Sequence, residues 1–212
     1  MRVSRAFAFI DLSGFTAFTD AHGDEEAGLV LADFRTAVRD ASSRRGVRVA
    51  KWQGDGAMIV GVEVRPLVEA VLEIEQRIDS GRSPLRLRAG ITAGRVIIFE
   101  GDDYIGSAVN LAARLCDIAA THEILAGCEI ADAVPPWASA EPVVPVEIRG
   151  FAHPVPALRL QHRGKHLADG VRDPVCGMLL PLDGVVARRG EEAFCSDSCA
   201  DAWDELHPLA VG

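Results

Sequence analysis

The sequence predicts an α+β fold with the element order β-α-β-β-α-β, followed by a small cysteine-containing module at the C-terminal end. Short apolar runs of strand length alternate with longer stretches of helical periodicity. An Asp-Gly turn separates two of these runs, which is a hairpin signal. Three cysteines cluster near the C-terminal end, beyond a polar stretch. The element order is that of the split ferredoxin-like arrangement.

The first half of this fold is predicted to contain three strands and a helical connection. Residues 6–11 (AFAFID) are an apolar run of strand length that ends at an acidic residue. Between residues 15 and 43, apolar side chains recur at mostly helical spacing, and His22-Gly23-Asp24 divides them into two helices. Residues 47–52 and 57–62 are strand-like runs on either side of the Asp-Gly turn.

The second half begins with a helix at 66–78, which has Pro66 early and an apolar face. The remaining predicted elements are strands at 85–91 and 96–99, a helix at 106–118, a short strand at 124–126 and a closing hairpin of 146–148 with 157–160. Residues 161–170 are polar and contain two glycines, which is typical of a linker. We therefore expect one domain at 1–160 and a second at 171–212.

The composition is that of a globular protein with a substantial core, because 49% of the 212 residues are hydrophobic. Thirty-one acidic residues against 22 basic ones make nucleic acid a poor candidate partner. No apolar run approaches the ~20 residues that cross a bilayer, so we expect a cytoplasmic protein with no membrane span. Five cysteines, three of them clustered, favour metal binding over a disulfide framework.

Two carboxylates fall where strands of the predicted fold end. Asp11 closes the first strand and Asp55 lies in the turn between the next two, and in a split β-α-β-β unit these points can lie side by side. Two carboxylates in that position could hold Mg²⁺ or Mn²⁺ for phosphoryl-transfer chemistry. Alternatively, Asp11 caps the following helix and Asp55 only forms the hairpin.

Three sequence motifs occur in order along residues 1–160: FIDLSGFTAF, KWQGDGAMIV and DYIGSAVNLAARL. They resemble three motifs of class III adenylate and guanylate cyclases, and EIRGFAHPVPAL resembles the closing strand region of that family. The resemblance implies an adenylate cyclase that converts ATP to 3′,5′-cyclic AMP and pyrophosphate. It also implies two Mg²⁺ or Mn²⁺ ions per active site, and a homodimer with two sites, each built from both chains.

The resemblance assigns a role to six residues that match the family motifs. Asp11 and Asp55 would bind the metal ions, Lys51 with Asp103 would read the base, Asn110 would orient the ribose and Arg114 would stabilise the reacting phosphate. Asp102 is an alternative to Asp103, one position away.

Several of these roles also follow from the residues themselves. Asn110 and Arg114 are four apart and share one helix face. A carboxylate with an ammonium group suits the amine and the ring nitrogen of adenine. The backbone amides of Gly14, Phe15 and Thr16 begin a helix, so they could bind the leaving phosphates. Two alternatives stay open: a guanylate cyclase, and a non-catalytic protein that binds nucleotide and metal.

The C-terminal residues contain DPVCGM and AFCSDSC, followed by Asp-Glu-Leu-His-Pro. These segments resemble the YHS domain, a small treble-clef-like metal-binding module. Three thiolates suit Zn²⁺ or another soft metal, and a closed site needs a fourth ligand. The thiol ligands would be Cys176, Cys195 and Cys199, with His207 as the fourth candidate and Asp173 after it. Alternatively, the cysteines are small buried hydrophobic residues. We expect this module to regulate the cyclase.

Overall fold

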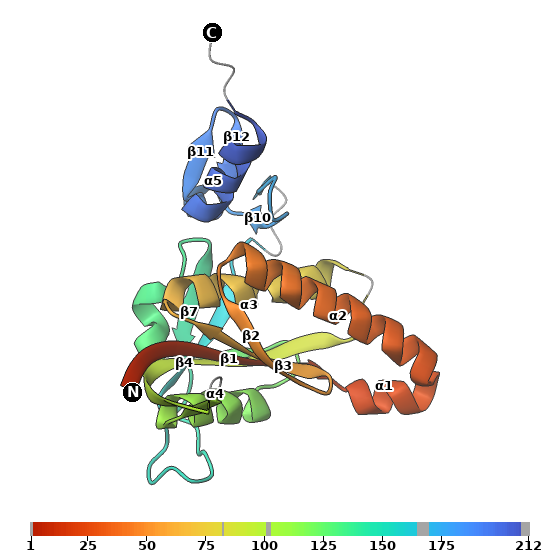
Figure 1. The fold of residues 1–212 in the computed structure, drawn as a ribbon, viewed down its shortest axis with the longest axis vertical. Coiled ribbons are helices and arrows are strands. Elements are labelled where there is room, and N and C mark those ends of the chain that lie inside the picture. Colours follow the sequence, from red (N-terminus) through yellow and green to blue (C-terminus); the bar gives the residue numbers. More distant parts are fainter. Residues whose placement is uncertain (1, 82, 101–102, 165–169, 209–212) are drawn as a thin grey trace.

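The computed structural model describes residues 2–81, 83–100, 103–164 and 170–208. Its centre is a mixed sheet with helices on both faces (Figure 1). α2 (Asp24–Arg44) and α3 (Val64–Ser80) lie on one face, and α4 (Ser107–Ile118) lies on the other. Successive side chains of the central strand point to opposite faces. Ala6 and Ala8 therefore face the core under α2 and α3, whereas Phe7 packs with α4.

The order of the strands confirms the predicted ferredoxin-like arrangement. The central strand is antiparallel to both of its neighbours, and the first four strands run β2-β3-β1-β4. Beyond β4 the sheet continues with β6, β8 and β7, and β5 pairs with the end of β4. The strands are β1 (Arg2–Ser13), β2 (Arg48–Gln53), β3 (Gly56–Gly61), β4 (Arg86–Phe99), β5 (Asp103–Ile105), β6 (Ile124–Gly127), β7 (Ala138–Pro142) and β8 (Ala157–His162).

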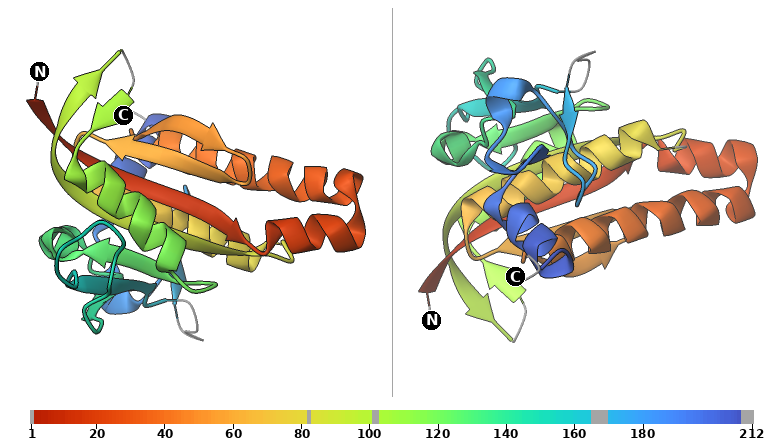
Figure 2. Two further views of the ribbon diagram at one scale, coloured as in Figure 1. Left: turned by 90° about the horizontal axis from the view of Figure 1, so that it is seen from below. Right: turned by 90° about the horizontal axis from the view of Figure 1, so that it is seen from above.

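The connection between β1 and β2 is the pair of helices that the sequence predicts. α1 (Phe15–His22) ends at Gly23, where α2 begins in a new direction, so the two helices form an arm that projects beyond the sheet (Figure 2). Gly23 has a φ of 85°, a left-handed backbone conformation that glycine adopts without a steric penalty. A short 3-10 helix, η1 (Cys128–Ala133), follows β6. Within the described residues, every helix is too short or too polar to cross a bilayer.

Two predicted features of the sheet are wrong. The strands expected at 85–91 and 96–99 are one continuous strand, β4, because β1 pairs with residues 86–97 without a break, including Ala93 and Gly94. The expected hairpin of 146–148 with 157–160 does not form. β8 pairs instead with β7, which the surrounding prolines concealed, and only an isolated bridge joins Val146 to Val155.

The C-terminal segment (residues 170–208) packs on the outer side of the α2 and α3 layer (Figure 1). It contains the short pair β9 (Val171–Arg172) and β10 (Leu179–Leu180), the 3-10 helix η2 (Leu182–Gly184), the hairpin of β11 (Ala187–Arg189) and β12 (Glu192–Phe194), and α5 (Asp197–Leu206). Its buried residues belong to the same apolar core as those of α3. Residues 161–162 of the predicted linker belong to β8, and residues 165–169 lie outside the described chain.

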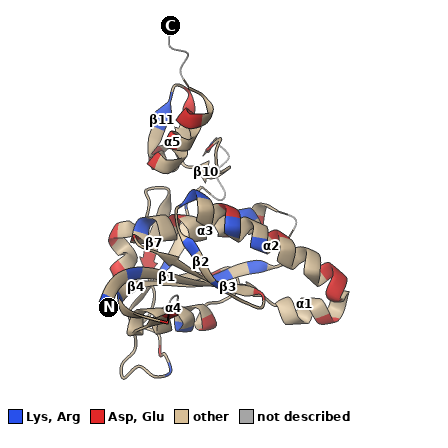
Figure 3. Ribbon diagram, viewed as in Figure 1, with Lys and Arg blue, Asp and Glu red and all other residues tan. Residues whose placement is uncertain are grey.

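This packing explains an unusual property of α3. Leu67, Val71 and Ile74 form its expected apolar face toward the sheet, but Glu69 and Glu73 on other faces are buried as well. Charged residues of both signs are interspersed along α2 and α3 (Figure 3). Because the C-terminal segment covers this outer surface, the carboxylates need partners inside the protein.

Candidate active site and thiol cluster

The two carboxylates expected to bind metal lie next to each other in one chain. Asp11 is paired in register with Gly56 of β3, and the backbone N–H of Leu12 donates to the carbonyl of Asp55 at 3.4 Å. A Cβ atom on Gly56 would lie 2.7 Å from the carbonyl oxygen of Ile10 and 3.1 Å from Oδ1 of Asp11. Glycine therefore lets the β2–β3 turn lie directly on the end of β1.

The electrostatics of this pair favour a bound cation. Burial, followed by the nearby charge of Asp11, raises the pKa of Asp55. The positive charge of Arg88 opposes this shift without cancelling it, so a cation beside the two carboxylates would stabilise their charged forms further. Their oxygen atoms are the ligands that Mg²⁺ and Mn²⁺ prefer, so these residues fit a hard divalent cation.

Arg88 is a residue of this site that sequence reasoning missed. It faces Asp11 from β4, in register with it, and donates two hydrogen bonds to Oδ2 from Nε at 2.8 Å and Nη2 at 2.6 Å. The hydrogen bond to Asp11 is the main cause of the raised pKa of Arg88. The sequence of β4 also contains Arg86 and Arg95, so nothing local marks Arg88, and its partner depends on strand pairing.

Lys51 and Asp103, the residues expected to read the base, form an ion pair between β2 and β5. Both side chains are about half exposed, at 47% and 49%. The structure thus brings together two residues that are far apart in the sequence, on an open surface where a ligand could reach them. Asp102, the alternative to Asp103, lies outside the described residues.

Asn110 and Arg114 lie on the exposed face of α4, as their spacing predicts. Nη1 of Arg114 donates to Oδ2 of Asp117, one turn further along the same helix, at 3.1 Å. Both side chains are therefore exposed, and the ion pair of Arg114 is formed with a residue of its own helix.

The residues expected to bind the leaving phosphates lie at the start of α1. Gly14 precedes the helix with a left-handed φ of 82°, and Phe15 and Thr16 form its first turn. Phe15 and Thr16 also line a shallow hollow together with Thr19, Asp20 and Asp24. The two aspartates make the far side of this hollow unfavourable for phosphate, so any anion would contact the backbone amides.

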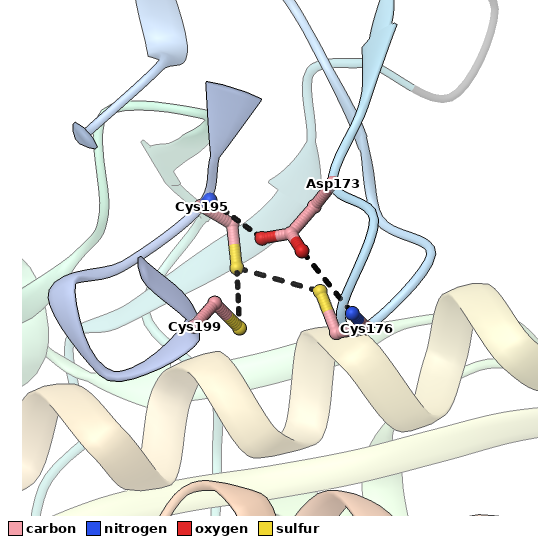
Figure 4. Close-up of side chains that lie close together, drawn as sticks. All are labelled: Asp173, Cys176, Cys195 and Cys199. Atoms are coloured by element: carbon pink, nitrogen blue, oxygen red, sulfur yellow. Dashed lines mark hydrogen bonds between the residues drawn. The ribbon is translucent and has the colours of Figure 1, made fainter. Parts of the chain in front are cut away.

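The three C-terminal cysteines converge on one another and on Asp173 (Figure 4). All four residues are buried, and their ligand atoms lie within 4.8 Å of one another. Sγ of Cys195 is 3.5 Å from Sγ of Cys176 and 3.7 Å from Sγ of Cys199. Hydrogen bonds from the other two cysteines lower the pKa of Cys199, whereas the same contacts raise the pKa of Cys176.

The fourth member of this cluster is Asp173 and not His207. Asp173 accepts hydrogen bonds from the backbone N–H groups of Cys176 at 3.1 Å and Cys195 at 2.8 Å, which fixes its carboxylate beside the sulfur atoms. The ring of His207 instead stacks on Trp203 with a centroid distance of 3.7 Å, at the exposed end of α5. The expectation of His207 as fourth ligand is therefore corrected, because its helix directs it away from the thiols.

The chain is similar to several nucleotidyl cyclases. No protein-family model matches the chain. It is 37% identical to an uncharacterized protein of Mycobacterium tuberculosis over 158 residues, covering 74% of this chain and 41% of that protein. It is 32% identical to a pH-sensitive adenylate cyclase of the same species (60% of this chain, 32% of that protein) and 32% identical to an adenylate cyclase of Streptomyces coelicolor (60% and 33%). The chain thus spans less than half the length of these relatives.

Solved structures have the same fold. The adenylyl cyclase CyaB from P. aeruginosa has a TM-score of 0.67 and 23% identity, covering 79% of this chain and 98% of that one. The guanylate cyclase domain of RhGC from Catenaria anguillulae, in complex with GTP, has a TM-score of 0.69 and 18% identity, covering 77% and 99%. The chain therefore contains the fold of a nucleotidyl cyclase catalytic domain.

Proposed function

We propose that this protein is an adenylate cyclase that converts ATP to 3′,5′-cyclic AMP and pyrophosphate. The observation that carries the proposal is the turn with Asp55 lying directly on Asp11, within a cyclase fold. The adenylate cyclases among its relatives support ATP as the substrate.

Within the proposed site, the two oxygen atoms of the Asp11 carboxylate have different partners because of Arg88. Its two hydrogen bonds hold Oδ2, while Oδ1 faces the turn that carries Asp55. Oδ1 and the Asp55 carboxylate are then the oxygen atoms that would hold Mg²⁺ or Mn²⁺. Bound cations of this kind make the ribose 3′-oxygen a better nucleophile and neutralise the phosphates.

Lys51 and Asp103 would select adenine. The carboxylate accepts from the exocyclic amine, and the ammonium group donates to a ring nitrogen. Guanine would instead place a carbonyl oxygen against Asp103. Because this carbonyl oxygen cannot donate to the carboxylate, we expect ATP to be preferred over GTP by at least about 10-fold.

Asn110 and Arg114 would complete the site from a second chain, with Asn110 orienting the ribose and Arg114 stabilising the charge that develops on the α-phosphate. This arrangement explains why both residues face outward in one chain. An apolar patch supports association: Ile97, Phe99 and Ile105 are 38%, 47% and 53% exposed where β4 pairs with β5. Exposed apolar groups of this size and proximity are typical of protein interfaces.

A direct assay tests the proposal. Purified protein is incubated with ATP and Mn²⁺, and cyclic AMP and pyrophosphate are measured, with GTP as competitor. Asp55→Asn should lower turnover by at least about 100-fold. Asp40→Asn is a matched control, because Asp40 pairs with Arg77 on the outer helices. Binding of ATP without any product would instead indicate a non-catalytic nucleotide-binding protein, and preference for GTP a guanylate cyclase.

We further propose that the thiol cluster binds Zn²⁺ or another soft metal. In a tetrahedral site with Zn–S bonds of ~2.3 Å the sulfur atoms lie ~3.8 Å apart. The separations of 3.5 and 3.7 Å around Cys195 are close to that value. One zinc ion per chain should be found by mass spectrometry of the native protein. Cys195→Ser should lose it and Cys128→Ser, an exposed cysteine elsewhere, should keep it.

The C-terminal segment is proposed to regulate the cyclase through α2. The C-terminal end of this helix leads to Arg45, which contacts the thiol cluster, and Arg35 in its middle donates to the carbonyl of Gly54 at 3.2 Å, next to Asp55. α2 and the residue that follows it thus contact both sites. Turnover of the native protein should differ between zinc-loaded and chelator-treated samples. Equal turnover in the two samples would refute regulation by metal.

A further inference from the structure

The side chain of Arg45 is fully buried between the sheet-forming part of the chain and the C-terminal segment, with 0% exposure. It follows the last residue of α2. Burying a guanidinium group is costly unless charged or strongly polar partners surround it. The identity of these partners therefore indicates what the residue is for.

The guanidinium group has two sets of partners. Nε donates to Glu73 at 3.0 Å and Nη1 donates to Glu69 at 3.1 Å, both on α3. On its other side, Nη1 donates to Oγ of Ser196 at 2.6 Å, and Nη2 lies 2.9 Å from Sγ of Cys195 and 3.8 Å from Sγ of Cys176. Arg45 thus joins the carboxylates of the cyclase fold to the sulfur atoms of the C-terminal segment.

We infer that Arg45 is part of the thiol metal site, so that the site is complete only when the C-terminal segment is docked on α2 and α3. The inference rests on the proposed metal site. Three thiolates and a carboxylate around a divalent cation leave an excess of negative charge in a buried place. Arg45 is the positive group in contact with the sulfur atoms, and hydrogen bonds from outside the ligand shell tune a metal site strongly.

The guanidinium group lies beside the sulfur atoms rather than in the place of a metal ion. Nε and Nη1 are bonded to Glu69, Glu73 and Ser196. Nη2 is 2.9 Å from Sγ of Cys195 but 3.8 Å from Sγ of Cys176, so it lies at the side of the cluster and not at its centre. A positively charged hydrogen-bond donor beside the cluster reduces the repulsion between the thiolates. Loss of Arg45 should therefore weaken metal binding. If the guanidinium group instead occupied the metal position, its loss would strengthen metal binding.

Other contacts show that the cysteine positions depend on the cyclase fold. Nε1 of Trp137, from the chain leading into β7, donates to the carbonyl of Cys195 at 2.8 Å. The side-chain amide of Gln76 on α3 donates to the carbonyl of Gly177 and accepts from the N–H of Leu179, both at 3.2 Å. Cys195 is thus held at its sulfur by Arg45 and at its carbonyl by Trp137. Metal binding and docking should be a single coupled equilibrium.

The test measures Zn²⁺ affinity of the full-length protein by competition with a chromophoric chelator. Arg45→Met should weaken Zn²⁺ binding by about 10- to 100-fold, as expected for loss of an outer-shell partner. Arg45→Lys keeps the charge but not the forked geometry, so it should show a smaller loss. This variant checks that the loss in Arg45→Met does not come from a folding defect. Arg44→Met is the matched control, because Arg44 also bonds Glu73 and should leave affinity within about 3-fold.

A second measurement follows docking directly. Added Zn²⁺ should protect the C-terminal segment (residues 170–208) of the native protein from limited proteolysis, and this protection should be lost in Arg45→Met. Unchanged or tighter Zn²⁺ binding in both Arg45 variants would overturn the inference while leaving the metal site intact. Native protein that binds no more Zn²⁺ than Cys195→Ser would refute the metal site itself.

Discussion

Mixing two inactive variants should restore cyclase activity if each active site is built from two chains. Asp11→Asn damages the half-site that holds the carboxylates, and Arg114→Ala damages the half-site on α4. In a heterodimer of these two chains, one site carries both lesions and the other carries none. The structure motivates this combination of variants because Asp11 and Asp55 lie together within one chain, whereas Arg114 is exposed on α4.

The expected magnitudes follow from the contacts of each residue. Asp11→Asn removes a negative charge that accepts two hydrogen bonds from Arg88, so the guanidinium group would then repel a cation beside Asp55. Each variant alone should lose at least about 100-fold in turnover, as is typical for a preorganised charged group. Random reassociation makes about half of the dimers heterodimers with one good site of two, so about one quarter of native activity should return.

The assay measures cyclic AMP formation before and after the two variants are mixed and allowed to re-equilibrate. A mixture of Asp11→Asn with Asp55→Asn is the control, because both lesions fall in the same half-site and no intact site can form. Activity no greater than the sum of the parents in the first mixture would show that the site is not shared. Rescue in the control mixture would show that Asp11 and Asp55 do not act in the same half-site.

Four further results are expected. Burial raises the pKa of Glu69 to about 7, so stability should fall by up to about 3 kcal/mol as pH rises from about 4.5 to about 7, and denaturant unfolding of Glu69→Gln should lack this loss. Burial raises the pKa of Cys116 to about 12, so iodoacetamide should label exposed Cys128 and spare Cys116 in peptide mass spectra; equal labelling contradicts this. Trp137→Phe removes the donor to the Cys195 carbonyl and should cost about 1–3 kcal/mol in denaturant unfolding, and an unchanged midpoint would contradict it. Ile105→Asp should weaken self-association at least about 10-fold in analytical ultracentrifugation, and an unaltered dimer would exclude this patch from the interface.

Local patterns in the sequence predicted most of the first four strands and the helices between them. The break between α1 and α2 follows from a glycine, and the hairpin with Asp55 follows from an Asp-Gly turn. The continuous β4 and the strand β7 were missed for a common reason. In both cases the partner strand, and not the local sequence, decides whether the residues adopt an extended conformation, because β-propensity depends strongly on packing and pairing.

For the site, the sequence by itself determined which residues are available: the carboxylates at the end of β1 and in the following hairpin, the helix face with Asn110 and Arg114, and the clustered cysteines. Only the tertiary structure decided their charged partners. Arg88 meets Asp11 across 77 residues, and Arg45 meets Cys195 across 150. Periodicity and turn signals act over a few residues, whereas the pairing of buried charges depends on which distant elements the packed core brings together.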